Sequence, residues 1–209
     1  MKIDYFHDGR RIPSLDGMRA VAIGIVILAH ALGTRHFLYR KQVYEVVGDL
    51  GPLGVRIFFI ISGFLITSIL LQELGQTGCV SLRRFYLRRA FRIFPAFYCF
   101  LGVMLLATWC MGYSIPFAEW TAAATYSINY LEHRDWYLTH CWSLAVEEQF
   151  YLLWPLTIWW LGRRRALVIA IFIVVLVPWI RVVTAVVFPA HRYSIPWEFH
   201  TICDGLATG

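Results

Sequence analysis

The sequence predicts an all-α, multi-pass transmembrane helical bundle, and three observations lead to that class. Of the 209 residues, 59% are hydrophobic and 15% are charged, whereas a soluble domain carries about 25% charged residues. Apolar stretches recur that reach the roughly 20 residues that a helix needs to cross a bilayer. Many aromatic residues, nine Trp among them, fall near the ends of these stretches, where interfacial belts place them.

The bundle is expected to have about six to seven membrane segments in one integral-membrane domain over residues 1–209. The five strong spans are predicted at 16–34, 53–72, 93–113, 143–161 and 166–188. Ser14 or Asp16 is the expected N-cap of the first of these helices.

Two further segments complete the expected bundle. The segment at 117–131 has only about 15 residues and contains Thr, Ser and Asn, so it is predicted to be re-entrant or interfacial rather than spanning. Another helix is expected to start near residue 198. The chain stops about a dozen residues into that helix, which is too short to span, and this predicts a domain without its C-terminal helices.

Clusters of Lys and Arg set the expected orientation, because cytoplasmic loops are enriched in these residues. The clusters fall within 1–19, 73–92 and 163–165. All three face the cytoplasm if the segment at 117–131 does not cross the membrane. The N-terminus is then cytoplasmic, and Trp142, Glu147 and Glu148 lie near the outer surface.

The first span contains two ionisable residues, Arg19 and His30, eleven residues apart. Eleven residues make about three helical turns, so both side chains lie on one helix face, roughly 16 Å apart along the axis. Ionisable residues within a membrane are costly and indicate function by default. The alternative is a structural histidine that hydrogen-bonds to a neighbouring helix, and this residue alone does not separate the two.

Polar residues in the second span and at the loop-to-helix junction before the third span suggest two more sites. Arg56 and Ser62-Gly63 interrupt a strongly apolar run, where Ser62 and Gly63 also suit plain helix packing. Arg88, Arg89 and Arg92 are three and four residues apart, so on a helix they share a face. Clustered guanidinium groups bind phosphates well, although ordinary anchoring to anionic lipid head groups is the alternative.

The fourth span opens with adjacent carboxylates, Glu147 and Glu148. Consecutive helical residues point about 100° apart, so at most one of the two faces a given cavity. Either could orient a histidine, bind a polar acceptor or neutralise Arg56. The alternative, which applies to at least one of the two, is that one carboxylate pairs with an arginine and the other is solvated.

Several function classes lose support. The five cysteines form no CxxC pair and no metal-ligand spacing, which indicates reduced packing residues and no metal site. No P-loop, GxSxG or HExxH motif is present. The basic residues flank predicted spans, so the net charge of +6 reflects topology rather than nucleic-acid binding.

Together these clusters resemble the membrane-bound acyltransferase-3 family, bacterial multi-pass enzymes that O-acylate glycans. The matching stretches, in order, are LDGMR (15–19) followed by His30, GVRIFFIISGFLIT (54–67), RRAFRIFP (88–95) and WSLAVEEQFYLLWP (142–155). Family members usually have more helices, so the resemblance also implies that C-terminal helices are absent here.

The resemblance implies transfer of an acyl group, often acetyl, from cytoplasmic acyl-CoA to a hydroxyl of a carbohydrate or lipid-linked glycan such as a surface polysaccharide or lipopolysaccharide. It places the protein in the bacterial inner membrane, without a tightly bound cofactor. His30 would be the general base, and Glu147 or Glu148 would orient it or the acceptor. The implied acyl-CoA ligands are Arg19, Arg88, Arg89 and Arg92; the implied supporting residues are Asp16, Arg56, Ser62, Trp142 and Ser143.

Two other interpretations remain. A transporter or channel would also place ionisable residues within spans, although no inverted repeat or matched pair of broken helices is present. An inactive, truncated acyltransferase is the other. Binding of acyl-CoA separates the enzyme from the transporter.

Overall fold

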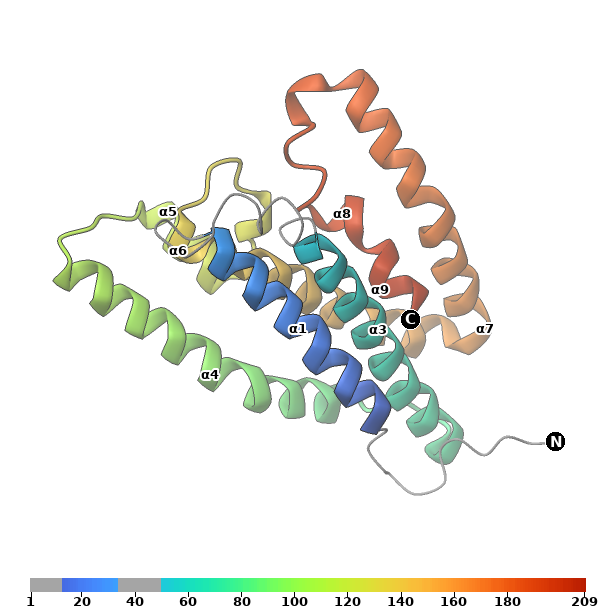
Figure 1. Cartoon of the computed structure of the whole chain (residues 1–209). Helices are drawn as coiled ribbons and strands as arrows, with labels where there is room; N and C mark the ends of the chain where they lie inside the picture. Colours follow the sequence, from blue (N-terminus) through green and yellow to red (C-terminus); the bar gives the residue numbers. More distant parts are fainter. Residues whose placement is uncertain (1–12, 34–49) are drawn as a thin grey trace. The chain divides into compact units, whose positions relative to one another are not determined.

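The computed structural model describes residues 13–33 and 50–209, and within those ranges the chain forms helices and no strands (Figure 1). The helices are α1 (Pro13–Gly33), α3 (Leu50–Thr77), α4 (Leu82–Cys110), α5 (Phe117–Ala124), η1 (Ile128–Tyr130), α6 (Trp136–Thr139), α7 (Cys141–Val187), η2 (Pro189–His191), α8 (Phe199–Ile202) and α9 (Asp204–Thr208). The predicted all-α class is therefore confirmed. The basic residues before residue 13 lie outside the described residues.

Four of the described helices are long and apolar enough to cross a membrane: Ser14–Leu32, Leu50–Thr77, Leu82–Cys110 and Trp136–Val187. The total number of membrane segments and their orientation stay predictions. The predicted N-cap of the first helix is wrong, because α1 begins at Pro13 and Ser14 and Asp16 lie inside its first turn. A proline has a fixed φ near −65° that suits the first helical position.

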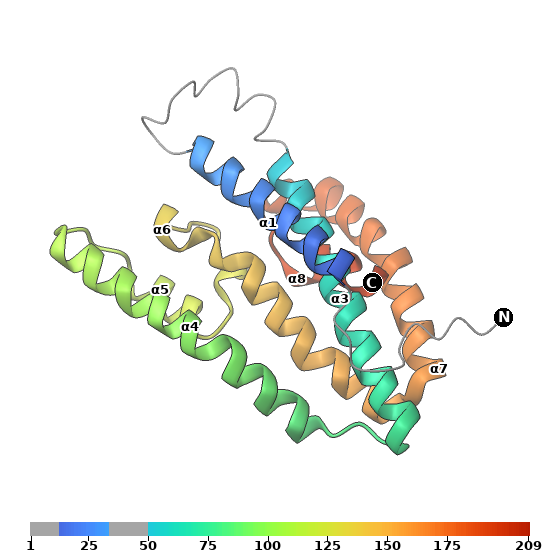
Figure 2. The ribbon, with the colours of Figure 1, turned by 60° about the horizontal axis from the view of Figure 1, so that its bottom comes forward.

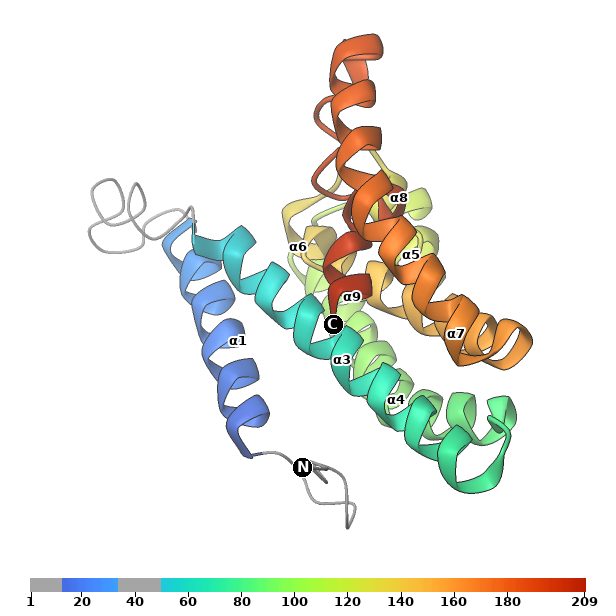
Figure 3. The same cartoon turned by 90° about the vertical axis from the view of Figure 1, so that its right-hand side faces the viewer.

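The chain divides into two compact units. The first comprises residues 1–72 and 205–209, and the second comprises residues 73–204. In the first unit α1 lies beside the N-terminal half of α3 (Figure 3). Gly54 permits this approach, because a Cβ there would lie 2.9 Å from both the Ala22 carbonyl oxygen and Val26 Cγ2.

Gly63 allows a second close approach in the first unit, between α3 and α9. A Cβ at Gly63 would overlap the carbonyl oxygen of Leu206 and would lie 2.8 Å from its carbonyl carbon. Only a residue without a side chain fits at this crossing, as expected where small residues let helix backbones meet.

The second unit is built on α4 and the first half of α7, which lie alongside each other (Figure 2). The Tyr86 hydroxyl donates to the Leu152 carbonyl across the pair at 2.8 Å. Helix α4 begins eleven residues earlier than the predicted span at 93–113, so the arginines expected in a loop occupy its first turns.

The segment predicted at 117–131 forms the eight-residue helix α5 and the three-residue helix η1. Neither is long enough to cross a bilayer, which agrees with a segment that does not span. Its apolar side chains close a buried cluster with α4 and the start of α7, formed by Phe97, Leu101, Ile115, Ala122, Ala123, Ile128, Leu138, Cys141 and Ala145.

Helix α7 is interrupted at Gly162, whose φ of 73° and ψ of 171° are not helical. The two halves correspond to the predicted spans at 143–161 and 166–188, and the second half turns back at the break (Figure 2). A positive φ is accessible to glycine at no steric cost. Arg163, Arg164 and Arg165 follow immediately and are exposed.

Candidate functional site

Helix α1 carries Arg19 and His30, both partly buried. Nδ1 of His30 lies 2.8 Å from the Val26 carbonyl oxygen one turn earlier. A carbonyl only accepts, so Nδ1 donates in this hydrogen bond, and Nε2 is the ring nitrogen that can act as a base. Arg19 Cζ lies 5.2 Å from the centroid of the Phe58 ring on α3, within the range of a cation–π contact.

The candidate residues of α3 have very different surroundings. Arg56 is exposed. Ser62 is 1% exposed, and its hydroxyl has no hydrogen-bond partner among the described residues. Gly63 next to it packs against α9, so the packing interpretation holds for the glycine.

Helix α4 separates the three candidate arginines. Arg88 and Arg92 are exposed, whereas the side chain of Arg89 is 16% exposed and its Nε lies 3.6 Å from Oε1 of Glu148 on α7. The Arg89 guanidinium also stacks over the ring of Tyr151, 3.3 Å from its centroid. Arg89 therefore does not join the outward-facing arginines.

Three exposed arginines of α4, Arg83, Arg84 and Arg88, border an open hollow of about 630 Å³. The hollow is lined by basic and apolar side chains and by no acidic one: Ser81, Arg83, Arg84, Leu87, Arg88 and Phe91. Like charges one turn apart repel by about 0.2–0.5 kcal/mol per pair. An anion in the hollow would relieve that repulsion and accept hydrogen bonds from the guanidinium groups.

The start of α7 holds the two candidate carboxylates in different environments. Glu147 is 3% exposed, whereas Glu148 pairs with Arg89. Ser143 donates to the His140 carbonyl at 3.3 Å. The Trp142 ring meets that of Trp197 edge to face, with centroids 5.0 Å apart.

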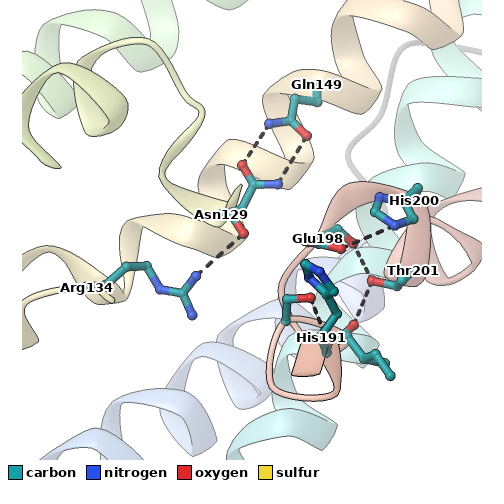
Figure 4. A network of polar contacts seen from close by, with 9 residues as sticks. Asn129, Arg134, Gln149, His191, Glu198, His200 and Thr201 are labelled. Atoms are coloured by element: carbon teal, nitrogen blue, oxygen red, sulfur yellow. Dashed lines mark hydrogen bonds and ion pairs between the residues drawn. The ribbon is translucent and has the colours of Figure 1, made fainter. Parts of the chain in front are cut away.

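A polar network covers this end of α7 (Figure 4). The side-chain amides of Asn129 and Gln149 bond to each other, the shorter contact running 2.8 Å from Gln149 Nε2 to Asn129 Oδ1. Arg134 donates to the Leu131 carbonyl at 2.7 Å. Burial lowers the pKa of the Arg134 guanidinium, and the Glu119 carboxylate opposes that shift.

Sequence reasoning did not select Tyr126, Asn129, Gln149 or Tyr151. Gln149 and Tyr151 stand within the WSLAVEEQFYLLWP stretch, directly after the carboxylate pair, and Asn129 is a polar residue in a mostly apolar segment. These positions could have been chosen on that basis. Nothing in the sequence distinguishes Tyr126 from the other ten tyrosines.

The structure thus brings Arg89 and Glu148 together in the second unit, and it holds Arg19 and His30 on one helix of the first. His30 and the two glutamates belong to different units. Among residues 13–33 and 50–209, no group of three or more His, Cys, Asp or Glu side chains could hold a metal ion.

Comparison with known proteins shows which family the chain resembles. The family model described as an acyltransferase domain (Acyl_transf_3) matches residues 12–200. The chain is 37% identical to a Staphylococcus aureus (strain COL) protein named "Putative O-acetyltransferase SACOL0978", over 70% of this chain and 24% of that protein. It is 35% identical to O-acetyltransferase OatA of S. aureus (strain NCTC 8325 / PS 47), over 84% of this chain and 30% of that protein. The match therefore covers 24% and 30% of the length of these two relatives, and no solved structure matches the chain.

Proposed function

The chain belongs to the acyltransferase-3 family, and on this premise we propose that it moves an acetyl group from acetyl-CoA to a hydroxyl of a cell-surface carbohydrate. The observation that carries the proposal is the hydrogen bond from His30 Nδ1 to the Val26 carbonyl. With Nδ1 donating, Nε2 is the ring nitrogen that would take up a proton, and it lies on the same helix as Arg19. A positioned histidine is the commonest general base, because its unperturbed pKa lies near neutral pH.

In the proposed reaction, Nε2 of His30 takes the proton of the acceptor hydroxyl as its oxygen attacks the thioester carbonyl. The new C–O bond forms, the C–S bond breaks, and the CoA thiolate receives the proton from the imidazolium. Glu147 or Glu148 orients the histidine or the acceptor. Asp16, Arg56, Ser62, Trp142 and Ser143 support the site.

The acyl donor is bound by arginines. Arg88 and Arg92 are exposed on α4, and guanidinium groups form bidentate hydrogen bonds with phosphates. They are the proposed ligands of the CoA phosphates, with Arg19 at the inner end of α1. Arg89 contributes from its inward position beside Glu148. This arrangement fits a bacterial inner-membrane protein whose N-terminus and arginine cluster are cytoplasmic.

The test measures transfer of labelled acetyl groups from acetyl-CoA to glycan in membranes that contain the protein. We expect His30→Ala to lower the transfer rate by about 10²–10⁴-fold, the usual contribution of a general base. His133→Ala is the matched control, because His133 is an exposed loop residue with no proposed role.

Arginine variants test the donor site in the same assay. Arg92→Ala should raise the concentration of acetyl-CoA needed for half-maximal transfer, whereas Arg164→Ala, an exposed arginine on α7, should not. The proposal fails if wild-type membranes transfer no label, or if His30→Ala and the wild type transfer at equal rates.

A further inference from the structure

Among the buried polar atoms of the second unit that have no hydrogen-bond partner within the described residues, three belong to α4, to α7 and to the segment between them: the Tyr126 hydroxyl oxygen, Arg89 Nε and Glu148 Oε1. A buried polar atom left in this state costs about 1–3 kcal/mol relative to hydration. Native proteins contain few such atoms, and each requires an explanation. Three of them in one neighbourhood indicate a site that a polar group completes.

Contacts of α4 and α7 with each other, and of α7 with the backbone of Tyr126, bring the three residues into one neighbourhood. Arg89 Nε and Glu148 Oε1 form an ion pair at 3.6 Å, which is too long for a hydrogen bond, so each atom can still take a hydrogen-bond partner. Gln149, the next residue after Glu148, donates to the Tyr126 carbonyl at 2.8 Å. Burial raises the pKa of the Tyr126 phenol, and the Glu148 carboxylate adds to that shift. The phenol therefore stays protonated and can donate a hydrogen bond.

The Tyr126 side chain is held firmly in place. Its ring stacks on Phe97 with centroids 4.8 Å apart and on Phe94 with centroids 5.9 Å apart. Its φ of 54° lies in the left-handed region, which is rare for a bulky residue. Such strain costs about 1–3 kcal/mol and persists only where the surroundings impose it, often at ligand sites. Two independent restraints thus fix the position of this hydroxyl.

The chemistry of the three atoms selects the group that fits. The Tyr126 hydroxyl and Arg89 Nε–H are donors, and Glu148 Oε1 is an acceptor. An amide complements them, because its carbonyl oxygen can accept both donors while its N–H donates to the carboxylate. A phosphate does not, since it would place a second negative charge beside Glu148.

We propose that Tyr126, Arg89 and Glu148 form a subsite for an amide of the pantetheine arm of the acyl donor. This inference rests on the proposed function, since acyl-CoA is the amide-containing substrate there. It also gives Arg89 a role distinct from that of Arg88 and Arg92. The exposed arginines bind the phosphates of the donor, and the buried one binds its neutral arm.

Tyr126→Phe tests the subsite, because it removes only the hydroxyl oxygen. The matched control is Tyr98→Phe. Tyr98 packs against the same Phe97 ring, but its hydroxyl already donates to the Ala124 carbonyl at 2.9 Å. Binding of acetyl-CoA, pantetheine and adenosine 3′,5′-bisphosphate is measured with the full chain in membranes.

We expect Tyr126→Phe to weaken acetyl-CoA and pantetheine about two- to tenfold, the loss of one hydrogen bond. Adenosine 3′,5′-bisphosphate should bind as before, and Tyr98→Phe should bind all three ligands normally. Arg92→Ala should show the reverse pattern, with weaker binding of the bisphosphate and unchanged binding of pantetheine. The thermal stability of Tyr126→Phe should equal or exceed that of the wild type, because the hydroxyl has no partner among the described residues.

Two results would overturn the subsite. Unchanged pantetheine binding in Tyr126→Phe would mean that the three atoms are completed by water alone. An equal loss for all three ligands, with a lower unfolding temperature, would mean that the tyrosine is purely structural. If the wild type binds the bisphosphate and acetyl-CoA but not pantetheine, the proposed amide subsite is wrong, whereas acetyl-CoA remains supported as the acyl donor. If the wild type binds none of the three ligands, both the amide subsite and the proposed acetyl-CoA donor are refuted.

Discussion

Replacing Gly63 by alanine tests the closest helix crossing of the first unit. The added Cβ would overlap the Leu206 carbonyl oxygen and would lie 2.8 Å from its carbonyl carbon and 3.2 Å from its Cα. Ordinary carbon–carbon contacts are about 3.5–4.0 Å long, so α9 must move away. The three nearest obstructing atoms all belong to the Leu206 backbone, so no side-chain rotation removes their overlap. Overpacking of this kind typically costs about 1–3 kcal/mol.

A control alanine separates this effect from the general preference of helices for alanine over glycine. Gly102 lies in the middle of α4, is exposed, and has no described atom within 4 Å of its ideal Cβ position. There the same substitution should stabilise the helix by about 0.5–1 kcal/mol. The two variants should therefore change stability in opposite directions.

Thermal unfolding of the protein in detergent micelles measures the difference. A change of 1 kcal/mol shifts the midpoint by roughly 2–4 °C for a chain of this size. Gly63→Ala should lower the midpoint by several degrees, and Gly102→Ala should raise it slightly. A Gly63→Ala variant that melts at or above the wild-type midpoint would refute the reasoning, because the α3–α9 crossing would not exist as described.

Three further expectations follow from single contacts. Asp204→Asn should lower the free energy of unfolding by about 1.5–3 kcal/mol in chemical denaturation, because Arg181 donates to this carboxylate at 2.5 Å and hydrogen bonds to charged groups contribute about that much. In a double-mutant cycle, Asp204→Asn should cost less when Arg181 is already replaced by Met. Gln149→Met should cost about 1–3 kcal/mol by the same assay, because it leaves a buried amide unpaired, and a loss under 0.5 kcal/mol would contradict the network. Burial raises the pKa of Cys203 to about 11, so maleimide at pH 8 should modify exposed Cys79 before buried Cys203. Since the unfolded thiol titrates near 9.0, the contribution of Cys203 to stability is present below pH 9 and is lost as the pH rises towards 11.

The main helices could be predicted because the bilayer imposes a simple rule on sequence. A run of about 20 apolar residues can satisfy its backbone in lipid only as a helix or a closed barrel. The break in α7 was predictable for the same reason, since Gly162 and three arginines end one apolar run before another begins. The early start of α4 was not, because a cluster of arginines suits a cytoplasmic loop and a helix equally well, since arginines are good helix formers.

The direction of individual side chains could not be predicted in the same way. Arg88, Arg89 and Arg92 lie within about one turn of helix, and their spacing does not say which of them faces inward. That depends on Glu148 and Tyr151, which come from another helix and meet Arg89 only after packing. The same holds for Tyr126, whose importance lies in burial and backbone strain, properties that no residue type or spacing reveals.

The ion pair between Arg89 and Glu148 limits which part of the acyl donor Arg89 can bind. Removing one partner of a buried ion pair is more costly than forming the pair is favourable, because the remaining charge stays desolvated. If Arg89 moved away from Glu148 to bind a phosphate, the Glu148 carboxylate would therefore remain in a low-dielectric site without a partner for its charge. A neutral ligand avoids this cost, since it can bond to both groups while the pair persists. The buried position of Arg89 thus favours a division of the arginine cluster, in which Arg88 and Arg92 bind anionic groups and Arg89 binds an uncharged one.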